Sequence, residues 1–430
     1  MADGLDILVV SQFFSPEMGA PAARFHDFGK LLVERGHRVT VLTGFPNSPS
    51  GRIPDAYRRR AAQREIIDGI TVLRGWIYAS PKLSKFTKAA GFASFAASAS
   101  LQALLRRVRA DVGIATSPPP TVGVPGMLLA RRLGAPLLFD VRDIWPEAIA
   151  ASGRLQSGTL IRVLEGLERA IYAASAAVTV VTEGKRERLL EKGVAPEKVF
   201  VIPNGVDLRR FEQQQPMPPE AWRALGLDPD RFTLLYAGIM NPPQGLDVLL
   251  DATAKLRAAA PDLAARFQLA MIGAGSLREH LMARVRSEGL GDSVRFVAEQ
   301  PRDAIPPLLR TADAIAVTLR PRKDSHTVPS KLYEAMASGR PVLVSADGAP
   351  AEILREANAG LATPASDADG LAQSIRTLLE DPARAAEFGA AGKRYAAAFD
   401  RGRLVERFEE VLRHVVAGAR HERERNGSAN

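Results

Sequence analysis

The chain of 430 residues, 46% hydrophobic and 24% charged, exceeds the roughly 250–300 residues at which one hydrophobic core stops growing, so we expect two domains. It contains no cysteine, which excludes disulfides, thiolate catalysis and cysteine-ligated metal sites. The net charge of +9 favours anionic partners such as nucleic acid, anionic lipid or a diphosphate, whereas the aromatic share of 6% argues against a groove for single-stranded nucleic acid.

Short runs of β-branched and aliphatic residues alternate with helix-like segments along the first 200 residues or so. The N-terminus enters such a run without a basic segment before it, so we expect no signal peptide and a cytoplasmic location. The runs that we interpret as buried parallel strands are residues 5–10, 38–43, 71–76, 111–116, 136–141 and 176–181. Strand–helix alternation of this kind is typical of a doubly wound α/β domain.

The loop after the first predicted strand, "SQFFSPEMGAPAAR" (11–24), is built largely from small residues. Gly19 and the alanines after it let a ligand approach the backbone, and the helix that begins there offers unpaired N–H groups. Any parallel α/β protein needs a tight turn at this point, so a purely structural loop is the alternative.

Residues 82–109 contain a long uncharged stretch, "AAGFASFAASASLQALL", which is too rich in alanine, serine and glycine for a membrane span. Its apolar residues could share one side of a helix: Phe86, Phe92, Phe95, Leu101, Leu104 and Leu105. The basic residues that flank it are Lys82, Lys85, Lys88, Arg106, Arg107 and Arg109. Two interpretations stay open: a core-facing helix of the first domain, or a helix that lies on an anionic membrane surface.

The segment "FDVRDIWPEA" (139–148) places Arg142, Asp143, Trp145 and Glu147 just after a predicted strand. Open α/β sheets bind ligands at the carboxyl ends of their strands, so these residues are candidates for an active site. The alternative is a structural ion pair beside a packing tryptophan. Three ionisable residues at one predicted rim favour the functional interpretation.

The two domains meet in the sequence near residues 201–222, where an Asn-Gly turn, a glutamine run and four prolines indicate a connector. The strands predicted beyond it are residues 231–238, 267–275, 293–298, 314–319 and 341–345, each followed by a helical segment. The run "MIGAGSLREHL" resembles a dinucleotide fingerprint, but Arg278 occupies the third glycine position, so a dehydrogenase is a poor interpretation.

The most informative stretch is "SHTVPSKLYEAMASGRPVLVS" (325–345), a turn that opens a helix and then a strand. Pro329 suits the first turn of a helix and leaves the next three N–H groups without intrahelical partners, so this end attracts an anion, to which Lys331 adds a full charge. Glu334 only accepts hydrogen bonds and therefore suits a vicinal diol such as a ribose. Diphosphate and ribose together indicate a nucleotide. The alternative is a capped amphipathic helix with an exposed Glu334.

Six segments in this order resemble the family-4 retaining glycosyltransferases, and above all bacterial enzymes of capsule, O-antigen and colanic-acid assembly such as the N-acetyl-L-fucosamine transferases. The resemblance covers about residues 5 to 415. The segments that carry it are "RGHRVTVLTGFPNSPSGR", "VRDIWPE", "VIPNGVD", "YAGIMNPPQGLDVLL", "MIGAGSLREHL" and "VPSKLYEAMASGRPVL".

The resemblance implies particular residue roles. Glu334 matches the second glutamate of the family's E-x7-E motif, which is expected on the ribose, whereas His326 stands in place of the first. Gln244 stands where the family has a diphosphate-binding lysine, and no arginine appears nearby. The cations that we expect to replace this clamp are Lys331, Arg320, Arg322 and Lys323.

Arg142 and Asp143 fall where many relatives carry an active-site histidine or acid, so we expect them and Glu334 in catalysis, with Asp143 positioning the acceptor hydroxyl. The acceptor side is assigned to Gly19, Arg24, Trp145 and Glu147. The predicted donor-binding residues are Gly19, Asn204, Gly238, Asn241, Gln244, Gly273, Lys323, His326, Val328, Pro329, Ser330, Lys331 and Glu334.

The resemblance also implies the GT-B fold, with two facing Rossmann-like doubly wound α/β domains, a cleft between them, and a final helix that crosses back onto the first domain. We expect the first domain at residues 1–205 plus 398–420 and the second at residues 206–397. Residues 421–430 are charged and lack apolar side chains, so we expect a disordered tail.

We therefore expect a retaining glycosyltransferase that uses a nucleoside diphosphate sugar, UDP-linked rather than GDP-linked, with N-acetyl-L-fucosamine or a related sugar as the group transferred. The expected acceptor is a lipid-diphosphate-linked sugar or other saccharide in O-antigen, capsule or related polysaccharide biosynthesis. No metal or other cofactor is expected, because the helix start can neutralise the leaving diphosphate. We expect peripheral contact with the inner membrane face through residues 82–109, and no nucleic acid. Two alternatives stay open, a nucleotide-sugar epimerase of the same fold and a basic nucleic-acid-binding protein.

Overall fold

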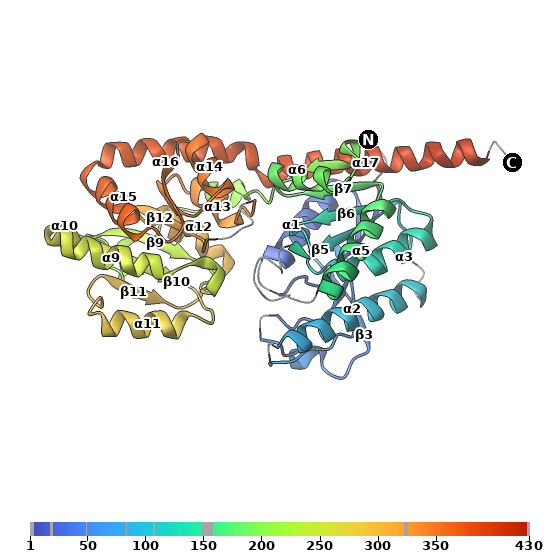
Figure 1. The fold of residues 1–430 in the computed structure, drawn as a ribbon, viewed down its shortest axis with the longest axis horizontal. Helices are drawn as coiled ribbons and strands as arrows, with labels where there is room; N and C mark the ends of the chain where they lie inside the picture. Colours follow the sequence, from blue (N-terminus) through green and yellow to red (C-terminus); the bar gives the residue numbers. More distant parts are fainter. Residues whose placement is uncertain are drawn as a thin grey trace. The chain divides into compact units, whose positions relative to one another are not determined.

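The computed structural model describes residues 4–17, 20–48, 50–82, 84–105, 108–147, 158–321 and 326–427 (Figure 1). The chain divides into two compact units. Unit 1 consists of Met1–Asn204 and Gly402–Asn430, and unit 2 consists of Gly205–Arg401. Each unit is an α/β domain built on its own sheet.

Unit 1 contains an eight-stranded sheet in the order β3-β4-β2-β1-β5-β6-β7-β8, parallel except for β3. Its strands are β1 Asp6–Val10, β2 Arg38–Gly44, β3 Ala62–Ile67, β4 Ile70–Gly75, β5 Val112–Ser117, β6 Leu137–Val141, β7 Ala177–Val180 and β8 Val199–Val201. The six predicted strands of this half are confirmed. The sequence analysis missed β3 and β8, because β3 is a half-exposed edge strand with charged residues and β8 has only three residues.

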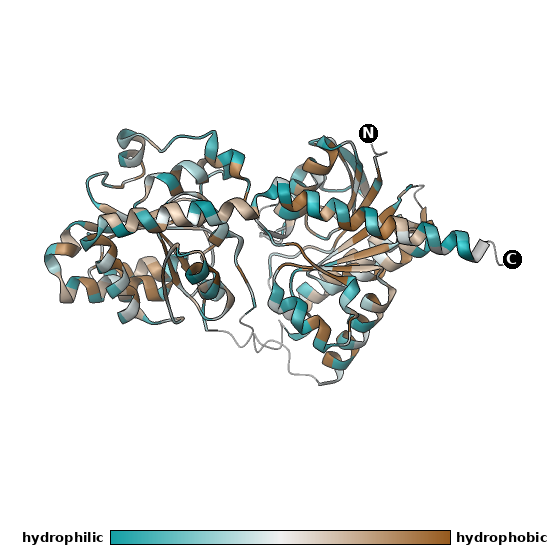
Figure 2. Ribbon diagram, turned by 90° about the horizontal axis from the view of Figure 1, so that it is seen from above, coloured by the Kyte–Doolittle hydropathy of each residue, from teal (hydrophilic) through white to brown (hydrophobic). Residues whose placement is uncertain are grey.

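Helices cover both faces of this sheet, which explains why its strands are apolar on both sides. The cluster on one face includes Phe25 and Phe28 of α1 (Ala20–Glu34) and Phe408 of α17 (Arg401–Gly427). The cluster on the other face includes Phe95 and Leu129. The helices of this second face are α2 Lys85–Leu105, α3 Gly123–Leu133, α5 Gly158–Ala174 and α6 Glu183–Glu191. Figure 2 shows the strands between the two layers as mainly hydrophobic.

The C-terminal helix α17 returns to unit 1 and fixes the chain's end there. Phe408 lies with its ring centroid 6.2 Å from that of Phe25 and 5.5 Å from that of Phe28. Glu409 is 8% exposed and accepts from Arg35 Nε at 2.5 Å and from Arg413 Nη2 at 2.7 Å. His37, whose Nδ1 accepts from the Leu5 N–H, brings its Nε2 to 3.2 Å from Glu409. Burial alone would raise the pKa of Glu409, but its cationic partners outweigh burial and hold the pKa at about 2.

The expected disorder from residue 421 is wrong for the described part of the tail, because α17 continues to Gly427. Its last turns are rich in arginine and glutamate, which are good helix formers even without a core to pack against. Figure 2 shows this end of α17 as hydrophilic.

The helix α2 buries one side and exposes the other. Phe95, Ala99 and Ala103, spaced by four residues, face the core, whereas Phe86 is 80% and Leu105 is 74% exposed. At about 100° per residue these two groups point in roughly opposite directions. The predicted grouping of all six apolar side chains on one side is therefore wrong. The core-facing interpretation holds for the buried side, and contact of the exposed side with a membrane stays a prediction.

Unit 2 contains a six-stranded, all-parallel sheet in the order β11-β10-β9-β12-β13-β14. Its strands are β9 Phe232–Ala237, β10 Phe267–Ile272, β11 Val294–Val297, β12 Ala314–Thr318, β13 Val342–Ser345 and β14 Gly360–Thr363. The five predicted strands are confirmed, and the short, partly exposed edge strand β14 was missed.

The helices of unit 2 cover both sheet faces, where two hydrophobic clusters lie. They are α7 Leu208–Glu212, α8 Pro219–Ala224, α9 Asp247–Ala259, α10 Pro261–Ala265, α11 Arg278–Ser287, α12 Ile305–Thr311, α13 Ser330–Ala337, α14 Ala349–Glu356, α15 Ala368–Glu380 and α16 Pro382–Ala396. Both ends of unit 2 lie together, because Val206 N–H donates to Phe399 O at 3.0 Å and Arg401 N–H donates to Val206 O at 2.8 Å.

We expect Glu409→Gln to lower the free energy of unfolding at pH 7 by about 1.5–3 kcal/mol, because it removes a charge-assisted acceptor from Arg35 and Arg413. The folded-state pKa of Glu409 lies below its ordinary 4.5, so this stabilisation is present above about pH 4.5 and is lost as the pH falls towards 2. Urea unfolding at pH 7 and pH 3 measures it. Glu410→Gln, an exposed neighbour, is the control, and an equal effect of both variants would contradict the assignment.

Candidate functional site

Two glycine-containing loops meet at the carboxyl edge of the unit 2 sheet. Gly273, with φ 140°, directly follows β10. Its backbone lies so close to that of Gly238 that a Cβ at residue 273 would stand 2.1 Å from the carbonyl oxygen of Gly238. The loop after β9 also donates from Met240 N to Ala274 O at 2.8 Å, and Asn241 Oδ1 accepts from the Ser276 N–H at 3.1 Å. These contacts explain the backbone at three predicted donor-binding residues, Gly238, Asn241 and Gly273. A nucleotide contact at each stays a prediction.

The helix α13 begins at the same edge. Pro329 is its N-cap, with φ −70° and ψ 136°, rather than its first helical residue, and the Leu332 N–H donates to Pro329 O at 3.0 Å. The expectation that three N–H groups are unpaired is therefore wrong for Leu332. Within the described residues the N–H groups of Ser330 and Lys331 have no acceptor, so two donors remain for an anion.

Glu334 lies one turn into α13 and is partly exposed. Its carboxylate has no hydrogen bond or ion pair within 4.0 Å to any residue that the structure describes. It lines a cavity of about 140 Å³ together with Val206, Arg302 and Arg401. A carboxylate with unused acceptor capacity on a cavity wall can receive two hydroxyl groups, as the sequence analysis expects for a ribose.

Lys331 connects α13 with the end of β9. Its Nζ donates to Gln244 Oε1 at 2.7 Å and to the Tyr236 hydroxyl at 3.0 Å, and it stands 4.3 Å from the centroid of the Tyr236 ring. The residue as a whole keeps some exposed surface, but burial of the amine lowers the pKa of Lys331 to about 7, and the charge of Glu334 opposes this only in part. Gln244, which replaces the family's lysine, thus holds a lysine from another element.

The remaining predicted donor residues differ in how far the structure describes them. Val328 is 6% exposed and belongs to the hydrophobic core, so its side chain is not available to a ligand. His326 is partly buried, and its predicted role is not tested. Lys323, Arg322 and Gly19 lie outside the described residues. A larger cavity of about 800 Å³ lies near the amino ends of the unit 2 strands. None of the predicted site residues lines this cavity.

In unit 1, the buried carboxylate of Asp140 on β6 accepts hydrogen bonds from three neighbouring elements. It is fully buried and accepts from Arg24 Nη2 at 3.1 Å, Thr116 Oγ1 at 2.9 Å and Thr179 Oγ1 at 2.9 Å. Arg24 also donates to the carbonyls of residues 202 and 203 at 2.9 Å and to Asn204 Oδ1 at 3.3 Å. These internal contacts give no support to the predicted acceptor-side role of Arg24. Asn204, a predicted donor-binding residue, likewise uses its side chain for this internal contact with Arg24.

Arg142 and Asp143 follow β6 and lie beside Lys185 of α6. Burial lowers the pKa of Arg142 to about 10, opposed by the charge of Asp140, and its Nε is buried without a partner in the described residues. Lys185 is 2% exposed, donates to the Arg142 carbonyl, and lies 3.6 Å from Asp143, whose side chain is 37% exposed. Asp143 is therefore accessible while its charge is balanced from inside. The sequence analysis missed Lys185, since nothing distinguishes it within "EGKRERLL".

Trp145 and Glu147 fasten the segment after Asp143 to neighbouring helices. The Trp145 ring meets Phe92 of α2 edge to face, with centroids 6.1 Å apart. Glu147 pairs with Arg188 at 2.9 Å and Lys192 at 3.2 Å, and these cationic partners lower its pKa although burial opposes them. Both predicted acceptor-side residues thus have structural contacts, and their contact with an acceptor is not tested.

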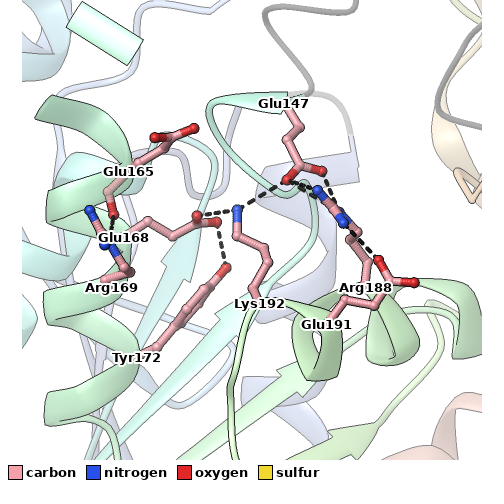
Figure 3. Close-up of polar contacts among 8 residues, drawn as sticks. All are labelled: Glu147, Glu165, Glu168, Arg169, Tyr172, Arg188, Glu191 and Lys192. Atoms are coloured by element: carbon pink, nitrogen blue, oxygen red, sulfur yellow. Dashed lines mark hydrogen bonds and ion pairs between the residues drawn. The ribbon is translucent and has the colours of Figure 1, made fainter. Parts of the chain in front are cut away.

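Lys192 joins Glu147 to a second, buried carboxylate (Figure 3). Glu168 of α5 is 3% exposed, lies 2.5 Å from Lys192 Nζ and accepts from the Tyr172 hydroxyl at 2.7 Å. Burial raises the pKa of Glu168, while Lys192 and Tyr172 oppose the shift. Through Lys192 and Arg188, these contacts fix the segment that contains Glu147 to α5 and α6.

No group of three or more histidine, aspartate or glutamate side chains in the described residues is arranged to hold a metal ion. Within the same residues, no helix combines the length and the apolar character that a bilayer crossing requires.

Known proteins match both halves of the chain. Residues 19–205 match the glycosyl transferase 4-like domain family, and residues 219–395 match the family of glycosyl transferases group 1. The colanic acid biosynthesis glycosyl transferase WcaI of Escherichia coli is 27% identical, over 80% of this chain and 84% of its own. A D-inositol 3-phosphate glycosyltransferase of Catenulispora acidiphila is 30% identical, over 69% of this chain and 71% of its own.

Among solved structures, the HepE protein of Anabaena in complex with UDP aligns with a TM-score of 0.69 and 20% identity, over 95% of this chain and 100% of its own. Likeness of this extent confirms the expected GT-B class of fold, with two Rossmann-like α/β domains.

We expect Lys192→Met to destabilise unit 1 by about 3–5 kcal/mol, because the variant leaves Glu168 buried without its cationic partner. Arg186→Met removes an exposed pair with Glu183 and should cost about 0–1 kcal/mol. Chemical denaturation of both variants measures the difference. Equal stability of the two would mean that Lys192 does not neutralise Glu168.

Proposed function

The chain belongs to the group 1 glycosyltransferases, and from this membership we propose that it transfers a sugar from a UDP-linked donor to a saccharide acceptor carried on a lipid diphosphate. The observation that carries the proposal is the start of α13, where Glu334 follows two N–H groups, and neither the carboxylate nor these N–H groups have a partner among the residues that the structure describes. The similarity to WcaI, which is named for colanic acid biosynthesis, supports polysaccharide assembly, and N-acetyl-L-fucosamine is a candidate sugar from the sequence resemblance.

The donor would be held through its nucleotide. Glu334 accepts from the ribose hydroxyls, and the open N–H groups of Ser330 and Lys331 face the diphosphate, where the helix dipole and the Lys331 amine favour negative charge. That HepE was solved with UDP and with UDP-glucose supports a uridine donor. These interactions neutralise a leaving diphosphate without a cation, so we propose transfer that needs no metal.

The chemistry would retain the configuration of the sugar. The bond between the anomeric carbon and the diphosphate oxygen breaks, the acceptor oxygen bonds to the same face of that carbon, and the acceptor's proton passes to the leaving diphosphate. Asp143, partly exposed and balanced by Lys185, positions the acceptor hydroxyl by accepting its hydrogen bond. Arg142 adds positive charge beside it.

A second acceptor class follows from the relatives named for D-inositol 3-phosphate, one of which is 30% identical. A phosphorylated inositol would present hydroxyl groups beside an anion, which also suits the segment after β6, where Arg142 and Lys185 lie beside Asp143. Incubation with UDP-sugars and each acceptor in turn separates the two classes by product mass. An exchange of label within a single nucleotide sugar, without an acceptor, would instead indicate an epimerase.

A lipid-linked acceptor would require unit 1 to reach a membrane surface. Large apolar side chains stand exposed around β4 and α2, among them Trp76, Phe86, Leu101, Leu104 and Leu105, which are 50%, 80%, 56%, 49% and 74% exposed. Lys82 and Lys88 are exposed near the first turn of α2, and the predicted Arg106 and Arg107 lie outside the described residues. Exposed apolar side chains with lysines near them in the chain suit the interface of an anionic bilayer.

Two variants should separate donor binding from transfer. Glu334→Gln should weaken UDP binding at least tenfold, because a neutral amide loses charge-assisted hydrogen bonds worth about 1.5–3 kcal/mol each. Asp143→Asn should keep UDP affinity and abolish transfer. Calorimetry and a transfer assay measure both, with the exposed Glu352→Gln as control. Unchanged UDP affinity in Glu334→Gln, or unchanged transfer in Asp143→Asn, would contradict the corresponding role.

The full-length protein should co-sediment with vesicles that contain anionic phosphatidylglycerol, and not with purely zwitterionic vesicles. Each cation near such a surface contributes about 1 kcal/mol, and added salt shortens the screening length below about 8 Å, so binding should fade at high salt. Lys82→Glu with Lys88→Glu should release the protein, whereas Lys393→Glu with Arg394→Glu, an equal charge change in unit 2, should not. Wild-type protein that ignores anionic vesicles at low salt would contradict membrane contact.

A further inference from the structure

The amine of Lys331 lies in a polar enclosure that contains no carboxylate from the described part of the chain. Gln244 Oε1 and the Tyr236 hydroxyl take two of its hydrogens, at 2.7 Å and 3.0 Å, and both partners are neutral groups. Tyr236 is fully buried and donates its own proton to Ile239 O at 2.8 Å, so its oxygen is free to accept. Within the described residues no carboxylate oxygen lies within 4.0 Å of Lys331 Nζ.

The enclosure is closed by backbone. Gly238, with φ 145°, lies near the amine of Lys331. A Cβ at this position would stand 3.1 Å from Lys331 Nζ and 3.6 Å from the Tyr236 hydroxyl. The Tyr236 hydroxyl also lies 3.4 Å from Gln244 Oε1, so β9 and the segment after it supply the groups that surround the amine. Tyr236 and Gln244 are therefore positioning residues, which fix the amine of Lys331, a residue of the first turn of α13.

A buried ammonium with only neutral partners is unfavourable until an anion arrives. The groups that face the amine are Tyr236, Gln244, the backbone at Gly238 and, at longer range, Glu334. Burial raises the pKa of Tyr236 well above its usual value, so that phenol stays neutral, and Gln244 does not titrate. Among these groups Glu334 alone brings negative charge, and it does not offset burial of the amine.

We propose that donor binding places a proton on Lys331, so that the enzyme takes up one proton from solvent as the diphosphate binds at α13. The proposal rests on the proposed function, because it needs the diphosphate at the start of this helix. The step balances simply: the neutral amine gains a solvent proton and becomes an ammonium, and no bond of the donor changes. Release of the nucleoside diphosphate after transfer returns the proton.

The direction with pH follows from the two states of the amine. With burial holding the pKa of the unliganded Lys331 at about 7, the amine is already protonated at pH 6 and mostly neutral at pH 8.5. A bound diphosphate is a counter-ion and raises this pKa towards its ordinary 10.5. Proton uptake should therefore be small at pH 6 and close to one at pH 8.5. Between those two pKa values the affinity for UDP should fall by up to about tenfold per pH unit.

The test is titration calorimetry of the full-length protein with UDP, in two buffers of different ionisation enthalpy, at pH 6 and pH 8.5. The terminal phosphate of UDP, whose pKa is about 6, itself titrates at pH 6, so proton uptake at that pH is taken as the difference between wild type and Lys331→Arg, whereas UDP is fully ionised at pH 8.5. We expect an uptake near one proton for wild type at pH 8.5. Lys331→Arg, whose guanidinium is always charged, should bind UDP with no uptake. Gln244→Glu supplies a counter-ion, so it should also abolish the uptake.

Lys393→Met is the matched control, since Lys393 is exposed on α16 and should leave the uptake unchanged. UDP binding by wild type without proton uptake at pH 8.5 would overturn this proposal and leave the proposed function intact. Uptake that persists in Lys331→Arg would also overturn it, by assigning the proton to another group. A wild-type protein that binds no UDP at either pH would overturn the proposed function instead.

Discussion

Parallel strand pairing determines where each sheet of this protein is buried and where polar side chains reach its surface. Each parallel pair needs a crossover, and the helices that make the crossovers cover both faces of each sheet, so the strands become apolar on both sides. Polar side chains that face solvent then lie mainly at the ends of the strands and on the outer faces of the helices. In unit 1 Asp143 and Arg142 follow β6, and in unit 2 Lys331 and Glu334 follow the loop after β12. The candidate site residues therefore lie at the carboxyl edges of the two sheets, where open α/β sheets bind ligands.

The interior of unit 1 shows how this edge is kept in order. Asp140 and Glu168 are buried carboxylates, and each is matched by a cation from another element, Arg24 in one case and Lys192 in the other. A buried pair of this kind contributes little net stability, but loss of one partner is costly, so the pairs fix position more than they strengthen the fold. Asp143 differs from both because its side chain is 37% exposed while Lys185 behind it is buried. Its negative charge is thus available to a ligand.

The sequence predicted the architecture well, because strand runs and connectors depend on local patterns. Eleven strands were expected where fourteen occur, and the three missed ones are short or half-exposed edge strands, whose weak patterns only pairing can reveal. Individual side chains were harder to predict. The sequence cannot show that Arg24 turns inward to Asp140 or that Phe95 and Phe86 leave α2 in opposite directions, since partners far along the chain decide both. The helix start at Ser330 was found because proline and the following residues act locally.

Gln244 illustrates how a substitution in one loop is answered by another element. A lysine at this place would bring a second ammonium within hydrogen-bonding range of Lys331, and two buried cations with no carboxylate near them would repel each other. A neutral amide avoids that repulsion and accepts a hydrogen bond from the amine. Under the proposal made above, the same choice leaves the Lys331 amine mostly neutral at pH 8.5 when the site is empty, so that at this pH the cation forms when an anion binds. Under the same proposal, release of the nucleoside diphosphate returns the proton to solvent, so the charge that favours the bound anion does not stay in the empty enclosure.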